Sequence, residues 1–336
     1  MLKKAKNILS DYSWEIMLGV MIIIIATIAS NLSPYYLSFD QITYSLSNTI
    51  VIPGILGLAF MLVIVLGEMD LSLPSILAIG TVTMAKLSIL NVPIYLALPI
   101  VMLFGAILGG LNGWLIGKYK LPSIAVTIGT MGAYRALALY IGGQKSFASS
   151  SFSSSYTWLG TTYIFNRIPV SLVVLLALFL VFIYIMNRTI FGRLLYSIGN
   201  NEEATKFSGH NTLKIKIIVF SISGAIAGFG AYQFIGQYQS ARANNASTIL
   251  LFVVACVVLG GFDAQGGKGN VIGLLLSLLL VGTMMNAMGL LNIQGPIQTL
   301  IIGLIMVTAI SFPVISKWIN RFYKKISQVE NFINKE

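Results

Sequence analysis

Long apolar runs separated by short polar segments extend along almost the whole chain. The runs are continuous rather than alternating, and most approach the twenty or so residues that an α-helix needs to cross a bilayer. The pattern predicts an all-α polytopic membrane protein with about ten transmembrane helices in a single domain covering 1–336. The expected spans are 14–30, 49–66, a third ending near 90, 94–117, 121–142, 169–187, 217–234, 246–259, 271–290 and 297–315.

The longest polar interruption lies in the middle of the chain, at 191–211, with the sequence FGRLLYSIGNNEEATKFSGHN. Its charged residues would keep the segment in water, and its apolar residues would form the kind of small face that a short docking helix presents. A plain solvated connector is the alternative, but the clustering favours docking of another protein. The charged residues are Arg193, Glu202, Glu203 and Lys206, and the apolar ones are Leu194, Leu195, Ala204, Phe207 and Gly209.

Two glycines in the run 94–117 predict a close contact between helices. Gly105 and Gly109 stand four residues apart, so both lie on one face of the helix. Small residues at this spacing allow the backbone of a neighbouring helix to approach closely.

Composition supports the membrane assignment. Hydrophobic residues make up 57% of the chain and charged residues 9%, whereas about a quarter of the residues in soluble domains are charged. A net charge of +11 would suggest a nucleic-acid partner for a soluble protein. Here the basic residues lie in tails and short loops, where they set membrane orientation, so we expect no nucleic-acid partner.

The distribution of basic residues tests the ten-helix topology. If the N-terminus is cytoplasmic, only Lys145, Arg167 and Arg242 fall outside the cell, and Lys86 and Arg135 fall within spans. The other sixteen of the 21 Lys and Arg residues then lie on the cytoplasmic side. This asymmetry predicts that both ends are cytoplasmic, with basic tails at 1–13 and 317–336 and a cytoplasmic segment at 188–216.

A weak internal sequence similarity suggests two repeated halves. The second span ends in Gly-Glu-Met-Asp at 67–70, and the eighth ends in Gly-Gly-Phe-Asp at 260–263. Both are followed by small and polar residues and then by another span. A parallel structural repeat is a common plan in transporters.

Acidic and basic residues within or beside the spans are the first candidate site residues. Unpaired charges in hydrocarbon are costly, so Glu68, Asp70 and Asp263 are expected to face a cavity, a partner or a membrane surface. Two interpretations stay open: a broken helix lining a substrate path, or a turn in which Asp70 or Ser72 caps the third helix. Arg135 could contact substrate hydroxyls, snorkel to the interface, or pair with a buried carboxylate.

No set of residues has the spacing of a catalytic or metal site. His210 is the single histidine, and no carboxylate pair, His/Cys cluster or Ser-His-Asp set is present at credible spacing. The segment GGFDAQGGKG at 260–269 fails as a phosphate-binding loop, because Phe262 stands where the first glycine should be and Gly269 where Ser or Thr should be. We therefore expect no enzymatic activity, and no metal, ATP or other cofactor bound by this chain.

Four segments resemble the permease subunits of ABC importers of the ribose, xylose, galactoside and autoinducer-2 class, which are type II importers. They are GEMDLSLPSILAIG (67–80), NGWLIGKYKLPSIAVTIGTMGAYRALALYIGG (112–143), FGRLLYSIGNNEEATKFSGHN (191–211) and, more weakly, LGGFDAQGGKGNVIG (259–273). Their order and spacing match from about 45 to 312.

The resemblance implies a set of partners and a mechanism. A second permease, identical or paralogous, would pair with this chain in the cell membrane of a prokaryote. Two ATP-binding domains, possibly fused in one subunit and carrying ATP and Mg²⁺, would dock from the cytoplasm. An extracytoplasmic binding protein would deliver a sugar or sugar-like ligand, and the helices would rock between outward-open and inward-open states.

The resemblance also assigns residues. The segment after the sixth span would couple to the ATPase through Gly192, Arg193, Gly199, Asn200, Glu202, Glu203, Ala204 and Gly209. The chain departs from the family pattern at Glu68, Pro74, Asn200, Thr205 and His210, which puts the identity of the ligand in doubt. A sugar path should be polar and uncharged, and the candidates for it are Asn112, Thr127, Thr130 and Asn286.

Two other classes of protein remain as rivals. An ion-coupled secondary transporter would use Glu68, Asp70 and Asp263 as titrating intramembrane acids. An intramembrane enzyme would need a catalytic set, which the residue spacing does not supply.

Overall fold

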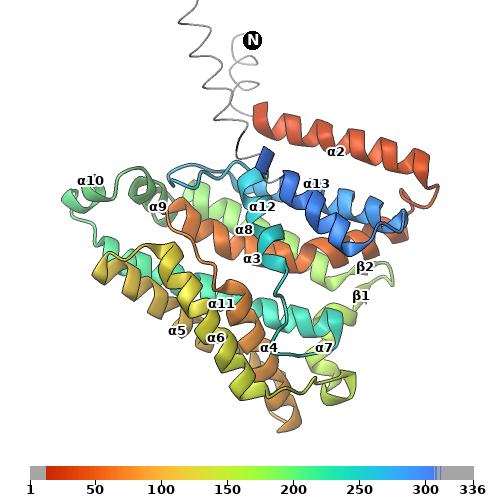
Figure 1. Ribbon diagram of the computed structural model, residues 1–336, viewed down its shortest axis with the longest axis horizontal. Coiled ribbons are helices and arrows are strands. Elements are labelled where there is room, and N and C mark those ends of the chain that lie inside the picture. The colour runs from red at the N-terminus through yellow and green to blue at the C-terminus, as the bar shows by residue number, and fades with distance from the viewer. Residues whose placement is uncertain (1–12, 306, 309–310, 312–336) are drawn as a thin grey trace, which may run out of the picture.

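The computed structural model of the chain describes residues 13–305, 307–308 and 311. The predicted basic tails, apart from Ser13, and the end of the last expected span lie outside this part of the chain. The described residues form an assembly of helices with one small hairpin (Figure 1). The predicted all-α class is confirmed.

Seven of the described helices are long and apolar enough to cross a membrane, and three shorter apolar helices accompany them. In hydrocarbon a helix satisfies its backbone groups internally, so an apolar run of this length takes helical form. They correspond in order to the ten predicted spans. The long helices are α2 (Ser13–Leu32), α3 (Ser47–Val65), α5 (Ile94–Tyr119), α6 (Ser123–Gly142), α8 (Val170–Arg188), α11 (Thr212–Tyr238) and α13 (Val271–Leu290), and the shorter ones are α4 (Leu73–Ile89), α12 (Ile249–Leu259) and Gly295–Ile305.

The polar connections contain structure that the apolar pattern did not predict. The expected loop at 188–216 consists of two further helices, and α11 begins at Thr212 rather than near 217. The Ser-rich connection before α8 folds into a short helix and a hairpin. These elements are η1 (Gln41–Leu46), η2 (Ser149–Ser151), α7 (Ser154–Thr161), β1 (Tyr163–Ile164), β2 (Ile168–Pro169), α9 (Ile190–Asn200) and α10 (Glu202–Phe207).

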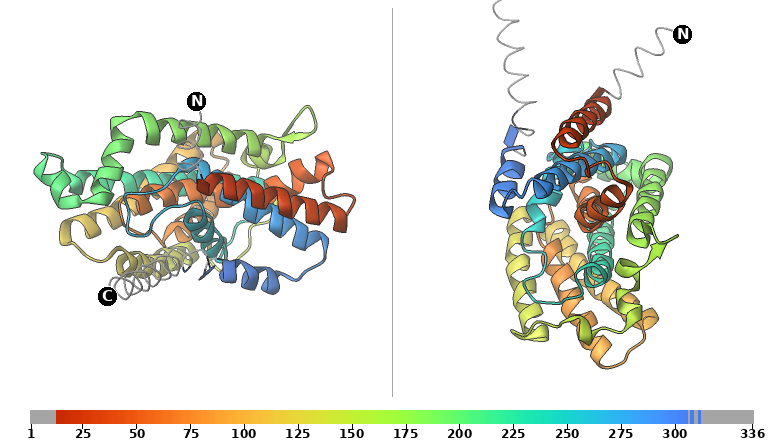
Figure 2. Two further views of the ribbon diagram at one scale, coloured as in Figure 1. Left: turned by 90° about the horizontal axis from the view of Figure 1, so that it is seen from above. Right: turned by 90° about the vertical axis from the view of Figure 1, so that its right-hand side faces the viewer.

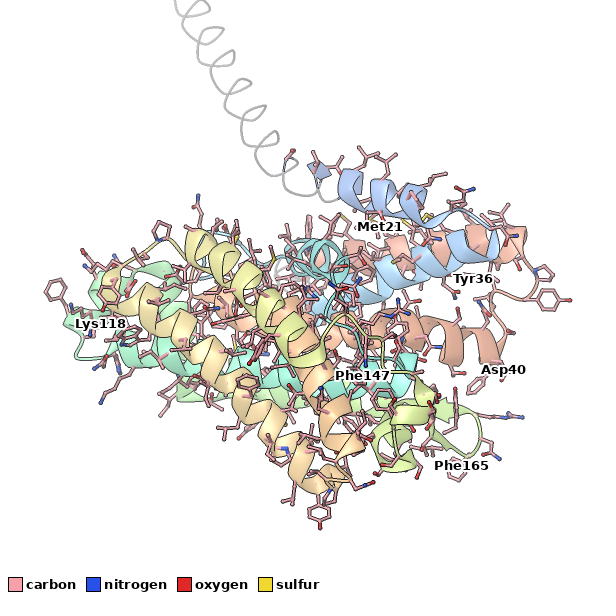
Figure 3. The ribbon with its side chains drawn as sticks, turned by 60° about the horizontal axis from the view of Figure 1, so that its bottom comes forward. Met21, Tyr36, Asp40, Lys118, Phe147 and Phe165 are labelled. Carbon is pink, nitrogen blue, oxygen red and sulfur yellow. The ribbon has the colours of Figure 1, made fainter. Side chains whose placement is uncertain are left out.

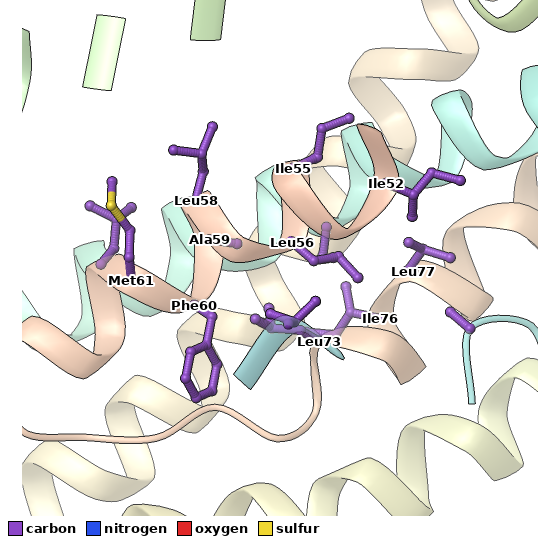
Figure 4. Close-up of a cluster of buried hydrophobic side chains, with 14 of the residues drawn as sticks. Ile52, Ile55, Leu56, Leu58, Ala59, Phe60, Met61, Leu73, Ile76 and Leu77 are labelled. Atoms are coloured by element: carbon purple, nitrogen blue, oxygen red, sulfur yellow. The ribbon is translucent and has the colours of Figure 1, made fainter. Parts of the chain in front are cut away.

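Helix α3 forms the centre of the molecule. Every residue from Ile50 to Val65 is buried, as expected for a helix that is apolar on all sides. Helices α4, α5 and α6 lie on one side of it, and α2, α12 and α13 lie on the other (Figures 1 and 2). Figure 4 shows α3 side chains packed against Leu73, Ile76 and Leu77 of α4.

Helices α5 and α11 make the close contact that the glycine spacing predicted. A Cβ atom added at Gly105 would overlap the carbonyl of Gly224, and one added at Gly109 would overlap the carbonyl of Phe220. One added at Gly224 would in turn overlap the carbonyl of Gly105. The two backbones therefore touch, and no larger side chain fits between them.

The internal repeat is visible in the turns that follow α3 and α12. Gly67 (φ 78°) and Gly261 (φ 87°) both end their helices in the left-handed conformation. In each case the next residue donates its N–H to the carbonyl five positions back, Glu68 to Val63 and Phe262 to Val257. This is the Schellman type of helix ending. The sequence comparison paired Gly67 with Gly260, but the glycine that occupies the equivalent left-handed position in the structure is Gly261, one residue later.

The turns after α4 and α13 match as well. Asn91 and Asn292 both have φ of 56°, and the residues after them, Val92 and Ile293, bond back to Leu87 and Met288. The unit α3–α4–α5 is thus echoed by α12, α13 and the helix Gly295–Ile305. Paired turns of the same geometry support the predicted repeat.

The two ends of the helices carry different connections. One end, which we call the α10 end, brings together α9, α10, the α5–α6 turn and the segments after α3 and α12 (Figure 1). The opposite end, the hairpin end, carries β1, β2 and the loop 239–248, which is joined to Phe147 by a two-way backbone bridge with Ala241. Lys118 and Phe165 mark the two ends in Figure 3.

Candidate functional site

Three successive helices at the α10 end each begin at a side-chain cap. The Thr189 hydroxyl accepts from the N–H of Gly192, Asn201 Oδ1 from Ala204 and Asn211 Oδ1 from Lys214. Such caps satisfy N–H groups that a helix start leaves unpaired. The polar residues that looked like a loop in the sequence are therefore helix boundaries.

Helix α9 is fastened to the transmembrane core by glycines. A Cβ atom at Gly199 would overlap the carbonyl of Val65 at the end of α3, and one at Gly192 would overlap carbonyls at the end of α8. Asn200 Nδ2 lies 3.4 Å from the carbonyl oxygen of Gly267, and the Tyr196 hydroxyl donates to the Gly269 carbonyl at 2.9 Å. The segment 260–269 is thus a support for α9.

Helix α10 projects away from this support. Phe207 is 91% exposed, and Glu203 and Lys206 beside it are also exposed. Gly209, in the left-handed conformation at φ 89°, then reverses the chain toward α11. A protruding helix with an exposed aromatic ring has the form of a docking element.

The predicted coupling residues therefore divide into two groups. Gly192, Gly199 and Asn200 pack against the core, whereas Arg193, Glu203, Ala204 and Gly209 are exposed. Leu195, expected on the exposed apolar face, is fully buried. Helix α9 turns it inward, so the docking face is smaller than the sequence suggested.

An ion triad joins α10 to the core, with Lys216 and Glu68 mostly buried and the Glu202 side chain 44% exposed. Lys216 Nζ in α11 lies 2.7 Å from Glu68 Oε1 and 2.8 Å from Glu202 Oε2. The Lys216 side chain is 8% exposed and that of Glu68 is 15% exposed. Burial alone would raise the pKa of Glu202, but its hydrogen bond and charge interaction with Lys216 hold that pKa below the ordinary value.

Lys216 was missed in the sequence because basic residues near helix ends are common. Its position at the start of an apolar run, four residues after Thr212, was the available signal. The triad connects the end of α3, the start of α11 and the start of α10.

A hollow of about 920 Å³ adjoins the triad. Its lining carries a small excess of positive charge, since the four lysines Lys118, Lys120, Lys206 and Lys216 face three glutamates, two of which share Lys216. Lys118 Nζ lies 5.0 Å from the centre of the Trp114 ring and 5.5 Å from that of Tyr119. Aromatic and basic side chains in this combination are typical of the membrane–water interface.

Four predicted path residues form one closed polar cluster with no exposure. Asp70 Oδ1 accepts from the Ser72 N–H at 3.0 Å and the Ser72 hydroxyl at 2.6 Å. Asn112 Nδ2 donates to Ser72 Oγ, and Thr127 Oγ1 donates to the carbonyls of Ser123 and Met69. The cluster ties the α3–α4 turn to α5 and α6. The helix start at Ser72 has no cap from its own side chain.

Asp70 is the member of the cluster whose hydrogen-bonding capacity is not fully satisfied. Its Oδ2 atom is buried without a hydrogen-bond partner among the described residues. Burial raises its pKa to about 6, although the two bonds from Ser72 act in the opposite direction.

The remaining predicted path residues lie apart from one another. Arg135 Nη1 donates to the carbonyls of Ala243 and Asn245 at 2.7 and 2.8 Å, so it holds the loop 239–248, and it forms no salt bridge with a carboxylate among the described residues. Thr130 bonds weakly to its own helix at 3.4 Å. Asp263 Oδ1 accepts from the Gln265 N–H in the turn after α12. Asn286 Oδ1 accepts from Gln41 and Ser45 at the hairpin end.

A second cavity, of about 490 Å³, lies toward the hairpin end and is called the polar cavity below. It is bounded by the starts of α3 and α12, the end of α11, and the helix Gly295–Ile305. Asn286 adjoins it through Ser45 and Met285; the other predicted path residues do not line it. Its lining is Ser45, Asn48, Thr49, Pro53, Gln237, Tyr238, Thr248, Ile249, Leu251, Phe252, Met285, Thr299 and Ile302.

Gln237 was missed by the sequence reasoning. Gln233 and Gln237 stand four residues apart near the end of an apolar run, which was a usable sign of a polar stripe on α11. Single polar residues near the end of a span are otherwise unremarkable.

No group of three or more His, Cys, Asp or Glu residues that could hold a metal ion occurs within the described ranges.

Comparisons with known proteins agree on one family. Residues 42–310 match the family described as branched-chain amino acid transport system / permease component. The chain is 32% identical to the ribose import permease protein of Haemophilus influenzae over 293 residues, covering 87% of this chain and 90% of that protein. It is 30% identical to the ribose import permease protein of Bacillus subtilis, with the same coverage, and 26% identical to the autoinducer 2 import system permease protein of an Enterobacter species, covering 93% and 97%. No solved structure matches the chain significantly.

Proposed function

The chain belongs to the branched-chain amino acid transport system / permease component family, and from this premise we propose that it moves a sugar or sugar-like molecule inward by alternating access, driven by ATP hydrolysis on separate subunits. It is a permease of the type II ABC importer class and a multi-pass protein of the cell membrane. The relatives named for ribose and autoinducer 2 support the class of ligand.

The observation that carries the proposal is the linkage from α10 to the core. Helix α10 presents Phe207 and Glu203 to solvent, and Glu202 at its start is bonded through Lys216 to Glu68 at the end of α3. A soluble ATPase that docked on α10 would therefore pull on the central helices. Such a linkage converts a movement of a soluble partner into a change of helix packing.

The other partners follow from the same proposal. The α10 end faces the cytoplasm, with both termini on that side, and the ATPase subunits carry ATP and Mg²⁺. A substrate-binding protein delivers the ligand at the hairpin end. A second permease, identical or paralogous, covers the open side of the polar cavity, because the hydroxyl and amide groups among its mostly apolar lining are costly to expose to lipid.

The ion-coupled rival would need acids that reach a water-filled path. Asp70 is fully buried in a closed cluster, Glu68 is neutralised by Lys216, and Asp263 lies in a turn at the α10 end. None of the three lines the polar cavity within the described residues. This arrangement favours the ATP-driven mechanism.

Uptake by the complete transporter tests the proposal. The variants Arg193→Glu and Glu203→Lys, alone and combined, should insert normally and lose uptake, because each reverses an exposed charge on the docking face. Lys214→Glu, on the exposed face of α11 and outside α9 and α10, is the matched control and should retain uptake. Full uptake by the double variant, or uptake by the purified permease without ATPase subunits, would contradict the proposal.

A further inference from the structure

We propose that the polar cavity is a binding subsite for a neutral, polyhydroxylated ligand, and that the Gln237 side-chain oxygen is one of its hydrogen-bond acceptors. This inference rests on the proposed transport function and adds to it a place and a chemistry for the ligand within the permease itself.

The lining of the cavity excludes charged ligands. Among the described residues that line it, none is Asp, Glu, Lys or Arg, while Ser45, Asn48, Thr49, Thr248 and Thr299 supply hydroxyl and amide groups. An amino acid would bring a carboxylate and an ammonium group that this lining cannot neutralise, and an unpaired buried charge is costly. A sugar brings hydroxyl groups that the lining can satisfy.

The orientation of the Gln237 amide is set by its neighbour. Its Nε2 donates to the carbonyl of Asn48 at 2.6 Å, and a flip would place two acceptor oxygens against each other. The Oε1 atom is therefore held away from Asn48, and it is buried without a partner among the described residues. Buried polar atoms in proteins almost always have a partner, and Gln237 lines the cavity, so a small shift of this side chain would bring its oxygen to a ligand hydroxyl group there.

A second acceptor lies on the facing helix. Pro53 has no N–H, so it cannot bond to the carbonyl of Thr49 four residues earlier in α3. Thr49 and Pro53 both line the cavity. The Thr49 carbonyl thus lacks its ordinary i+4 helical donor, which makes it a second candidate acceptor for ligand hydroxyl groups beside Gln237.

The apolar part of the lining also fits a sugar. Tyr238 and Phe252 both border the cavity, and Tyr238 is braced by Phe234, with ring centres 4.5 Å apart. A sugar ring has apolar C–H faces as well as hydroxyl edges. A mixed lining, mostly apolar with a few placed polar groups, is the usual form of a small-molecule site, and about 490 Å³ falls within the usual size range.

Cysteine labelling of the assembled transporter in lipid nanodiscs, with the second permease and the ATPase subunits present, tests the proposal. In a Cys256→Ala background, Thr49→Cys reports from the cavity, Phe165→Cys is the exposed aqueous control, and Leu103→Cys on the outer face of α5 is the lipid-facing control. A charged, water-soluble thiol reagent should label Thr49→Cys and Phe165→Cys but not Leu103→Cys.

Protection by ligand is the decisive measurement. D-ribose, D-xylose and D-galactose are added separately at high concentration, with L-leucine as the zwitterionic comparison. At least one sugar should slow labelling of Thr49→Cys about threefold or more, which corresponds to about two-thirds occupancy. L-leucine should have no effect, and no compound should change labelling of Phe165→Cys.

The role of Gln237 is tested by Gln237→Met, which is close in size but has no amide. When Gln237→Met is added to the Thr49→Cys protein, labelling in the absence of sugar should proceed at the same rate as before, which would show that the cavity is intact. Protection by sugar should disappear. The proposal is overturned if Thr49→Cys is not labelled, if no sugar protects, if L-leucine protects equally, or if Gln237→Met keeps full protection.

The result of the labelling experiment can be distinguished from the result of the uptake experiment that tests the proposed function. The coupling variants Arg193→Glu and Glu203→Lys should lose uptake and still show sugar protection. If protection is absent while uptake depends on the ATPase and on these residues, the subsite is wrong and the transport function stands.

Discussion

At the scale of single residues, the buried charges of this protein are either paired or held in polar clusters. Lys216 sits between Glu68 and Glu202, and Arg135 binds two backbone carbonyls. Asp70 is the exception, since one of its oxygens has no partner among the described residues. These three positions are where substitutions have the clearest expected effects.

Lys216→Met should destabilise the protein by about 3 kcal/mol, because it leaves Glu68 mostly buried without its cation. The melting temperature of the purified permease measures the change. Lys214→Met, on the exposed face of the same helix, is the control and should have little effect. Adding Glu68→Gln to Lys216→Met should recover part of the loss; no recovery would mean that the lysine acts by packing alone.

Asp70 should make stability depend on pH. Its pKa is raised from 3.8 to about 6, so the folded state binds its proton more tightly than the unfolded state does. The contribution of Asp70 to stability is therefore largest below its unfolded-state pKa of 3.8, and it is lost as the pH rises through about 6. Between about pH 5 and about pH 7.5 the loss should be about 1.4 kcal/mol.

The variant Asp70→Asn checks the source of this dependence. It has no carboxyl group, so the difference in melting temperature between the two pH values should shrink relative to the parent protein. Glu202 does not interfere, because its lowered pKa places its titration below this interval. An unchanged pH dependence in the variant would assign the effect to another group.

At the scale of elements, glycines decide which helices touch. Gly224 in α11 faces Gly105 in α5 so closely that a methyl group would overlap a carbonyl, whereas a Cβ atom at Gly129 in α6 would meet nothing within 4 Å. Gly224 and Gly129 lie in helices of similar apolar character. They differ only in whether another helix packs against them.

This contrast gives a matched pair of substitutions. Gly224→Ala should lower stability by about 1–3 kcal/mol through overpacking, and Gly129→Ala should be neutral or slightly stabilising because alanine favours the helix. Melting temperatures of the two purified variants compare them directly. Equal losses would mean that the α5–α11 contact is less close than described.

At the scale of the whole molecule, the charged segments gather at opposite ends. The α10 end holds Lys118 and the ion triad, and the hairpin end holds Phe165 and the loop with Arg242 (Figure 3). The positive-inside rule predicts a cytoplasmic α10 end, which is the orientation that we propose.

Labelling from the two sides of the membrane tests this orientation. Phe207 and Phe165 are each 91% exposed, at opposite ends. In a Cys256→Ala background, an impermeant reagent applied to intact cells or spheroplasts should label Phe165→Cys, and Phe207→Cys should react only after the membrane is opened. The reverse pattern would invert the proposed topology.

The order of the helices, and a close contact on the Gly105–Gly109 face of α5, could be predicted from the sequence, but α11 as the partner could not. Both depend on local properties, since run length sets a span and glycine spacing sets a smooth helix face. The segment 191–211 was recognised as special for the same reason, because its charges interrupt an apolar chain. Its division into an inward α9 and an outward α10 could not be seen, because it depends on the end of α3 and on Gly267.

The tertiary structure alone decided which polar residues act together. Asp70, Ser72, Asn112 and Thr127 come from α5, α6 and the α3–α4 turn, and they form one closed cluster rather than the separate path positions expected from their chemistry. Gln237 and Asn48 are 189 residues apart in the chain, yet one hydrogen bond orients the acceptor at the polar cavity. The length of each apolar run determines which part of the chain can span a membrane, but a partner distant in sequence is chosen only when the helices pack.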